Sequence, residues 1–89
     1  MLYTKLGKTN LRISRIGFGA WGIGGGAPNP GWKDIWKAED KVSKLSLAKA
    51  YENGVNFYDT ALVYGDGHSE KLISQTLKDK NIIVATKVP

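Results

Sequence analysis

Three side chains in the second half of the chain are suited to moving a proton together: Asp59, Tyr64 and Lys87. A phenol, with an ordinary pKa of about 10, donates protons poorly at neutral pH. A nearby ammonium lowers that pKa because it stabilises the phenolate. A carboxylate paired with the ammonium keeps it charged and oriented. The set therefore predicts a general acid tuned by its neighbours, which suits the reduction of a carbonyl group.

Each of these residues also has a purely structural interpretation. Asp59 could accept bonds from backbone donors at a strand end, Tyr64 could pack its ring within a loop, and Lys87 could be a solvated strand terminus. Their joint placement favours the chemical interpretation. His68 is the only histidine, and its position at a predicted helix start favours an exposed or capping role over catalysis.

The elements that must position these residues are short strands alternating with helices. We expect a hairpin from residues 3–6 and 11–14, strands at 16–20, 55–59 and 82–87, and helices at 39–53 and from about 69 to 81. This alternation predicts β-α-β units in a parallel sheet. Parallel sheets collect ligands at the carboxyl ends of their strands, and Gly19–Trp21, Asp59 and Lys87 all occupy such ends.

Apolar spacing predicts which faces of the two helices are buried. In the first helix the apolar positions are Val42, Leu45, Ala48 and Tyr51, with Leu47 and Ala50 widening the stripe. Asn53-Gly54 suits the end of this helix. The second helix is predicted to be capped by Ser69 and to end at Asn81. Its inward side chains are predicted to be Leu72, Ile73 and Leu77.

A glycine-rich segment follows the first predicted parallel strand. Gly17 to Gly22 matches G-x-G-x-x-G, the dinucleotide fingerprint. That fingerprint needs a helix opening directly from the glycines, whereas here a Gly/Pro-rich loop runs over 22–31 and an irregular turn is expected over 32–38, so the match is rejected. The loop is a candidate rim or lid. Trp21, Trp32 and Trp36 could line a pocket for a flat cofactor or substrate, or only pack the loop.

Composition narrows the class of protein further. The net charge of +5 comes from lysines and arginines scattered over turns and helix ends, which argues against nucleic-acid binding. The absence of cysteine removes disulfides and thiolate metal sites and is consistent with the cytoplasm. No metal site is predicted. Apolar runs are too short to span a membrane, and the first residues do not form a signal peptide.

Taken together, the motifs resemble the N-terminal portion of the aldo-keto reductase family, most closely its bacterial and potassium-channel-β-like branches. The matching segments are residues 6–9, 11–14, 17–21, 54–61, 64–65, 67–70 and 85–88. The resemblance implies an α/β fold, namely the N-terminal part of a TIM (β/α)8 barrel: the hairpin, about three parallel strands and two helices. Residues 1–89 would form one fragment of a single barrel domain.

The resemblance also implies a role for each site residue. Tyr64 would be the proton donor, Lys87 would lower its pKa, and Asp59 would support the lysine. Gly19, Ala20 and Trp21 would contact the nicotinamide side of NADP(H), with Asp59 near the ribose. Many relatives have a hydroxyl residue at the position of Ala20. The substrate would be a small aldehyde or ketone, of unspecified identity. The family's histidine and phosphate-binding residues belong to later sequence.

Length sets a physical bound, because a complete eight-stranded barrel needs about 250 residues and this chain has 89. Three strands leave an open edge at 82–87 and half-covered apolar faces. We therefore expect a piece of a larger enzyme that is inactive and unstable alone unless it self-associates through that edge. The alternative is a non-catalytic module, similar to channel β-subunits, that acts on a partner, or a fragment with no function of its own.

Overall fold

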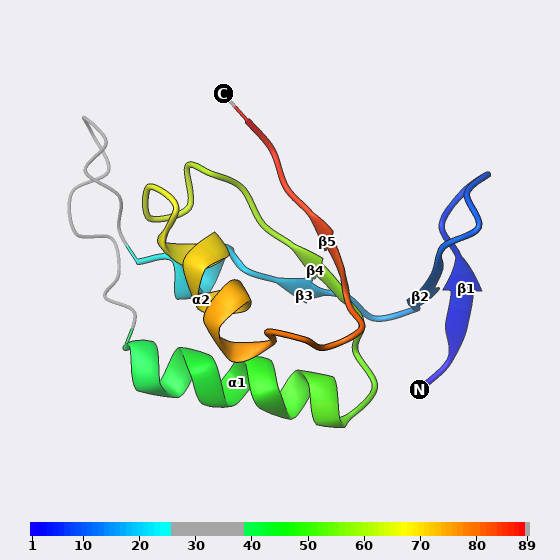
Figure 1. The fold of residues 1–89 in the computed structure, drawn as a ribbon, viewed down its shortest axis with the longest axis horizontal. Coiled ribbons are helices and arrows are strands. Elements are labelled where there is room, and N and C mark those ends of the chain that lie inside the picture. Colours follow the sequence, from blue (N-terminus) through cyan, green and yellow to red (C-terminus); the bar gives the residue numbers. More distant parts are fainter. Residues whose placement is uncertain (26–38, 89) are drawn as a thin grey trace.

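The computed structural model describes residues 1–25 and 39–88. The elements in chain order are β1 (Tyr3–Lys5), β2 (Arg12–Ser14), β3 (Phe18–Gly19), the 3-10 turn η1 (Trp21–Ile23), α1 (Asp40–Glu52), β4 (Phe57–Asp59), α2 (His68–Thr76) and β5 (Ile83–Ala85). Figure 1 shows α1 and α2 on one side of the sheet formed by β3, β4 and β5, with the β1–β2 hairpin set apart at the end where these strands begin. The predicted order of elements is confirmed.

The sheet is parallel, as predicted, and its strand order is β3-β4-β5. In its register Gly19, Asp59 and Ala85 lie side by side. Pairing continues past the strand ends, because the Thr60 N–H donates to the Ala85 carbonyl over 2.8 Å and the Ala20 N–H donates to the Asp59 carbonyl over 2.9 Å. Three carboxyl ends are thus fixed at one edge of the sheet.

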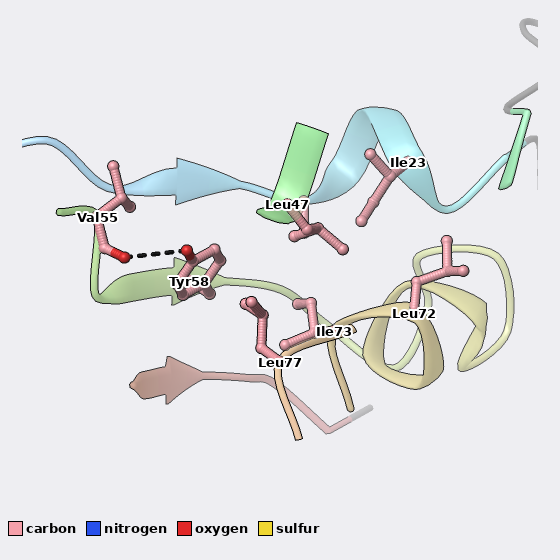
Figure 2. Close-up of a cluster of buried hydrophobic side chains, with 8 residues drawn as sticks. Ile23, Leu47, Val55, Tyr58, Leu72, Ile73 and Leu77 are labelled. Carbon is pink, nitrogen blue, oxygen red and sulfur yellow. Dashed lines mark hydrogen bonds between the residues drawn. The ribbon is translucent and has the colours of Figure 1, made fainter. Parts of the chain in front are cut away.

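The core lies between the sheet and the two helices. Its buried members are Ala20, Ile23, Leu47, Val55, Tyr58, Leu72, Ile73 and Leu77. Figure 2 shows Tyr58 beside Val55 at one end of this group, with its hydroxyl donating to the Val55 carbonyl over 3.0 Å. The rings of Tyr58 and Phe18 have their centroids 5.6 Å apart across neighbouring strands. Burial raises the pKa of Tyr58 to about 12.

The buried face of α1 differs from the predicted one. Leu47 is fully buried, but Val42 and Leu45 are 54% and 62% exposed. A helix turns by about 100° per residue, so a three-residue repeat drifts around the axis and its members cannot all share one face. The spacing from Ser43 to Leu47 and then to Ala50 keeps a single face, and this is the face that packs on the sheet.

The boundaries of α2 also correct the prediction. The helix begins at His68 with Gly67, in the left-handed region at φ 88°, as its N-cap, so Ser69 is not the cap. It ends at Thr76 instead of Asn81. The predicted inward side chains are confirmed, with exposures of 1% for Leu72 and 3% for Ile73 within α2 and 4% for Leu77 at its C-cap.

The hairpin is tied to the rest of the chain through Asn56, which precedes β4. The Asn56 side chain accepts from the Ser14 N–H over 2.6 Å and donates to the Arg12 carbonyl over 2.9 Å. The Ser14 hydroxyl in turn accepts from the Asn56 N–H over 3.1 Å. These bonds hold the hairpin at the end of the sheet opposite to the strand ends that carry Asp59 and Gly19.

All three parallel strands are shorter than predicted. β3 covers only Phe18–Gly19, and Ile16 is 65% exposed. The predicted turn over 32–38, with Trp32 and Trp36, and most of the glycine-rich loop lie outside the described residues. Within the described ranges, neither helix has the length and hydrophobicity that a bilayer span requires.

Candidate active site

Asp59 and Lys87 meet at the carboxyl ends of neighbouring strands. Asp59 is the last residue of β4, and Lys87 lies two residues beyond the end of β5. The Lys87 ammonium donates to the Asp59 carboxylate over 2.7 Å and to the Thr60 carbonyl over 2.8 Å. Both charged side chains are 56% exposed, so they face solvent at the open end of the sheet.

Tyr64 reaches the same place from the loop between β4 and α2. Its N–H donates to the Ala61 carbonyl over 3.1 Å, and its carbonyl accepts from the Ser69 N–H over 3.2 Å. The next three residues, Gly65 to Gly67, all have positive φ, as their turn-forming types suggest. The Lys87 ammonium lies 5.3 Å from the centroid of the Tyr64 ring. The structure therefore brings the three predicted residues together.

The electrostatics of this group favour a charged lysine. The pKa of Lys87 is raised above its ordinary value, first by the hydrogen bond to Asp59. Partial desolvation opposes this shift, while the negative charge of Asp59 and the contact with Tyr64 reinforce it. Lys87 is thus an ammonium throughout the neutral range, next to a phenol.

A buried hydroxyl network supports the site, and the sequence interpretation missed it. The hydroxyls of Thr60 and Ser69 are 2.8 Å apart, and the Ser69 hydroxyl donates to the Ala20 carbonyl over 3.0 Å. Thr60, Ser69 and Ala20 are all fully buried. The network joins the residues that follow β3 and β4 to the first turn of α2. The signal in the sequence is a hydroxyl residue directly after Asp59 and another in the first turn of α2, where a serine is also typical of a helix cap.

The segment predicted to contact a cofactor has two different environments. Gly19 is exposed, and a side chain at its position would meet no atom within 4 Å. Trp21 is 47% exposed. Between them, Ala20 is fully buried and both of its backbone polar groups are already hydrogen-bonded within the chain. Of these three predicted residues, Gly19 and Trp21 present an accessible surface, and Gly19 lies in register with Asp59.

His68 has a role outside this group. Its Nε2 lies 2.7 Å from the Asp40 carboxylate, which joins the first residues of α2 and α1. His68 and Asp40 are 36% and 51% exposed, in agreement with the predicted solvent-facing position. No cluster of His, Cys, Asp or Glu able to hold a metal ion occurs in residues 1–25 and 39–88.

A cavity of about 550 Å³ lies at the opposite end of the strands, near the hairpin. Tyr3, Tyr51 and Asn56 are among its lining residues. Two of its polar side chains already bond within the chain, since the Tyr3 hydroxyl donates to the Gly54 carbonyl and Asn56 binds the hairpin. The cavity brings together none of the proton-transfer residues, so the strand-end group remains the candidate site.

Parallel β-α-β units with polar residues at the carboxyl ends of the strands fit the class of β/α-barrel proteins. Comparison with known families specifies the class further. The model of the aldo/keto reductase family matches residues 15–89. The chain belongs to the aldo/keto reductase family.

Individual relatives agree with this assignment. Aldo-keto reductase AFTS1 of Alternaria alternata is 41% identical over 81 residues, which are 91% of this chain and 21% of that protein. Aldo-keto reductase YhdN of Bacillus subtilis is 35% identical over 92 residues, covering 98% of this chain and 25% of that protein. The chain therefore spans about a quarter or less of the length of these curated relatives.

Solved structures of the family superpose closely on the fold. A thermostable aldo-keto reductase in complex with the inhibitor epalrestat gives a TM-score of 0.77 at 36% identity, with 99% of this chain and 31% of that chain covered. An aldo-keto reductase from Bacillus halodurans in its holo form gives 0.79 at 29% identity, covering 99% and 26%. The predicted fold class, part of a (β/α)8 barrel, is confirmed.

Proposed function

We propose that Asp59, Tyr64 and Lys87 form the proton-donating part of a site that reduces aldehydes or ketones to alcohols with NADP(H). The observation that carries the proposal is the position of the Lys87 ammonium, 2.7 Å from the Asp59 carboxylate and 5.3 Å from the centroid of the Tyr64 ring. An ammonium held in this way can stabilise a phenolate that forms when Tyr64 gives up its proton. Membership of the aldo/keto reductase family supports the reaction class.

The chain's own residues account for the proton half of the reaction. A reduced nicotinamide cofactor, when bound, supplies a hydride for the carbonyl carbon. Tyr64 donates its phenolic proton to the carbonyl oxygen as the C=O double bond becomes the single bond of an alcohol. Lys87 stabilises the phenolate left behind, and Asp59 keeps Lys87 charged and oriented. Tyr64 regains a proton from solvent after the alcohol leaves.

The strand ends fit a flat ring beside these residues. Gly19 offers open backbone surface in register with Asp59, and the exposed face of Trp21 lies two residues away. The buried Ala20 would contribute to cofactor binding by fixing the backbone between Gly19 and Trp21. In this proposal Gly19 and Trp21 contact the nicotinamide side, and Asp59 lies near the ribose.

The test uses a hybrid barrel in which residues 1–89 replace the matching segment of the Bacillus subtilis relative. We expect the hybrid barrel to oxidise NADPH when given an aromatic aldehyde, and Tyr64→Phe to abolish turnover while NADPH affinity is retained. The matched control is Tyr3→Phe, because the Tyr3 hydroxyl bonds the Gly54 carbonyl at the far end of the molecule. Unchanged turnover in Tyr64→Phe would refute the role of Tyr64.

The same assay separates the proposal from a non-catalytic function. NADPH binding without turnover in the active-site-intact hybrid barrel would favour a binding module that acts on a partner. The 89-residue chain by itself is expected to give no turnover, since the part of it that the structure describes supplies three of the eight parallel strands of a complete barrel. Turnover by that chain alone would contradict this expectation.

A further inference from the structure

The turn that follows β3 packs directly against the loop that carries Tyr64. The contact is between backbones: the Gly24 carbonyl oxygen occupies the space that a side chain at Gly65 would need. In the other direction, a Cβ at Gly24 would lie 2.8 Å from the carbonyl carbon and 2.9 Å from the carbonyl oxygen of Tyr64. Such distances are shorter than atoms in proteins tolerate, so the contact depends on both residues being glycine.

Each side of this contact is held in place independently. Ile23, next to Gly24, is buried in the core with Leu47 and Leu72 (Figure 2). The Gly24 N–H closes the 3-10 turn by donating to the Trp21 carbonyl over 3.2 Å. On the other side, the Tyr64 carbonyl is bonded by the Ser69 N–H. A shift of the Gly24 backbone cannot be absorbed freely and would be passed to Tyr64.

We propose that Gly24 is a positioning residue for Tyr64: its missing side chain lets the turn after β3 set the distance between the phenol and the Lys87 ammonium. The inference rests on the proposed function of Tyr64 and adds a residue to which that function assigns no role. It also links the two halves of the site, because the same short turn begins with Trp21 on the cofactor side.

The chain supplies a matched pair of substitutions to test this. Gly24 has φ −71° and ψ −21°, which alanine adopts without strain, so Gly24→Ala changes only the packing against Tyr64. Gly22 lies in the same turn and does not have a positive φ. A Cβ added at Gly22 would meet no atom within 4 Å. Gly22→Ala therefore adds the same methyl group where there is room for it.

In the hybrid barrel we expect Gly24→Ala to lower kcat by roughly 10- to 100-fold, because a misplacement of about 1 Å at a reacting group can cost about 100-fold in rate. The Kd for NADPH is expected to change by less than about threefold, because the atoms nearest to the added methyl group belong to the backbone of Tyr64 and Gly65 and not to Gly19 or Trp21. Gly22→Ala is expected to keep both values. Equal kcat values for the two variants would overturn the inference.

A second measurement is independent of turnover. With 3-fluorotyrosine at position 64, the ¹⁹F chemical shift reports the surroundings of the phenol directly. We expect Gly24→Ala to move this resonance and Gly22→Ala to leave it in place; an unmoved resonance in Gly24→Ala would overturn the inference even if kcat fell. Loss of activity in Gly24→Ala together with full activity in Tyr64→Phe would instead remove the proposed function of Tyr64.

Discussion

Lys87 donates a 2.7 Å hydrogen bond to Asp59 across the ends of two neighbouring strands, and this bond is the largest cause of the raised pKa of Lys87. Because both side chains are 56% exposed, water screens their attraction and the pair adds little to the stability of the fold. The hydrogen bond instead orients Lys87, because it holds the ammonium beside the ring of Tyr64. Asp59 thus acts on the proposed acid through Lys87.

Asp59→Asn in the hybrid barrel is expected to lower kcat for aldehyde reduction by about 100-fold, because a neutral amide lacks the charge that orients the ammonium and keeps it protonated. Asp59 raises the pKa of Lys87, so its removal lowers that pKa and moves the alkaline limb of the kcat profile to lower pH. Steady-state kinetics at neutral and alkaline pH measure both effects.

The control for this variant is Asp66→Asn. Asp66 is exposed in the same loop as Tyr64 and has φ 53°, a conformation that asparagine also tolerates. We expect it to keep the rate and the pH profile of the parent. An Asp59→Asn variant that does the same would show that Lys87 is held without Asp59.

Ser69→Ala is expected to destabilise the hybrid barrel by about 1–3 kcal/mol, the cost of leaving buried polar groups unpaired. The substitution removes the hydrogen-bond partner of the buried Thr60 hydroxyl and one of the two donors to the buried Ala20 carbonyl, which keeps the 3.4 Å bond from the Ile23 N–H. Ser74→Ala, at an exposed position of the same helix, is the matched control and is expected to change stability little. Denaturant unfolding gives both free energies, and equal values would contradict the role of the network.

The sequence predicted the part of the site that depends on topology. Once strands and helices alternate, the ends of β4 and β5 must lie together, and Asp59 and Lys87 follow from that. Tyr64 follows because a loop of fixed length leads from the end of β4 into α2. None of these positions requires knowledge of side-chain packing.

What the sequence did not predict depends on distances between segments far apart in the chain. Ser69 has the residue type of a helix cap, and only the neighbouring carbonyl of Ala20 shows that its hydroxyl points into the core. The glycines at 24 and 65 each suit a turn, but their mutual contact exists only once β3 and β4 are paired. The orientation of α1 was mistaken because a three-residue repeat does not match the helical period.

The raised pKa of Tyr58 leads us to expect that the free energy of unfolding falls at alkaline pH. In the unfolded chain the phenol loses its proton near its ordinary pKa of 10.0, whereas in the folded chain the pKa is raised to about 12. The free energy of unfolding therefore has its full Tyr58 contribution below pH 10 and loses it as the pH rises through the folded value, at a slope of about 1.4 kcal/mol per pH unit.

Tyr58→Phe isolates this effect because phenylalanine keeps the buried ring and has no proton to lose. At neutral pH the variant differs from the parent hybrid barrel by the lost hydrogen bond to the Val55 carbonyl, worth about 0.5–1.5 kcal/mol. Between pH 10 and 12 its stability is expected to fall less steeply than that of the parent. Parallel curves from denaturant titrations would contradict the assignment.

The 89-residue chain studied alone is expected to self-associate through the edge of β5. Among the described strands β5 pairs only with β4, so its outer backbone groups are open to another strand, and Val84 within it is 44% exposed. A second copy of the chain can add to this edge. We expect Val84→Lys to weaken the association, because a charge on an edge strand opposes strand addition.

Sedimentation equilibrium over a range of concentrations, combined with circular dichroism, measures the association. Leu45→Lys is the control, because Leu45 is 62% exposed on α1 and makes the same change from an apolar to a charged side chain. It should leave the association constant close to that of the parent chain. A parent chain that is monomeric and unfolds cooperatively would mean that the three-strand sheet is stable with its edge open, and the expected self-association would be wrong.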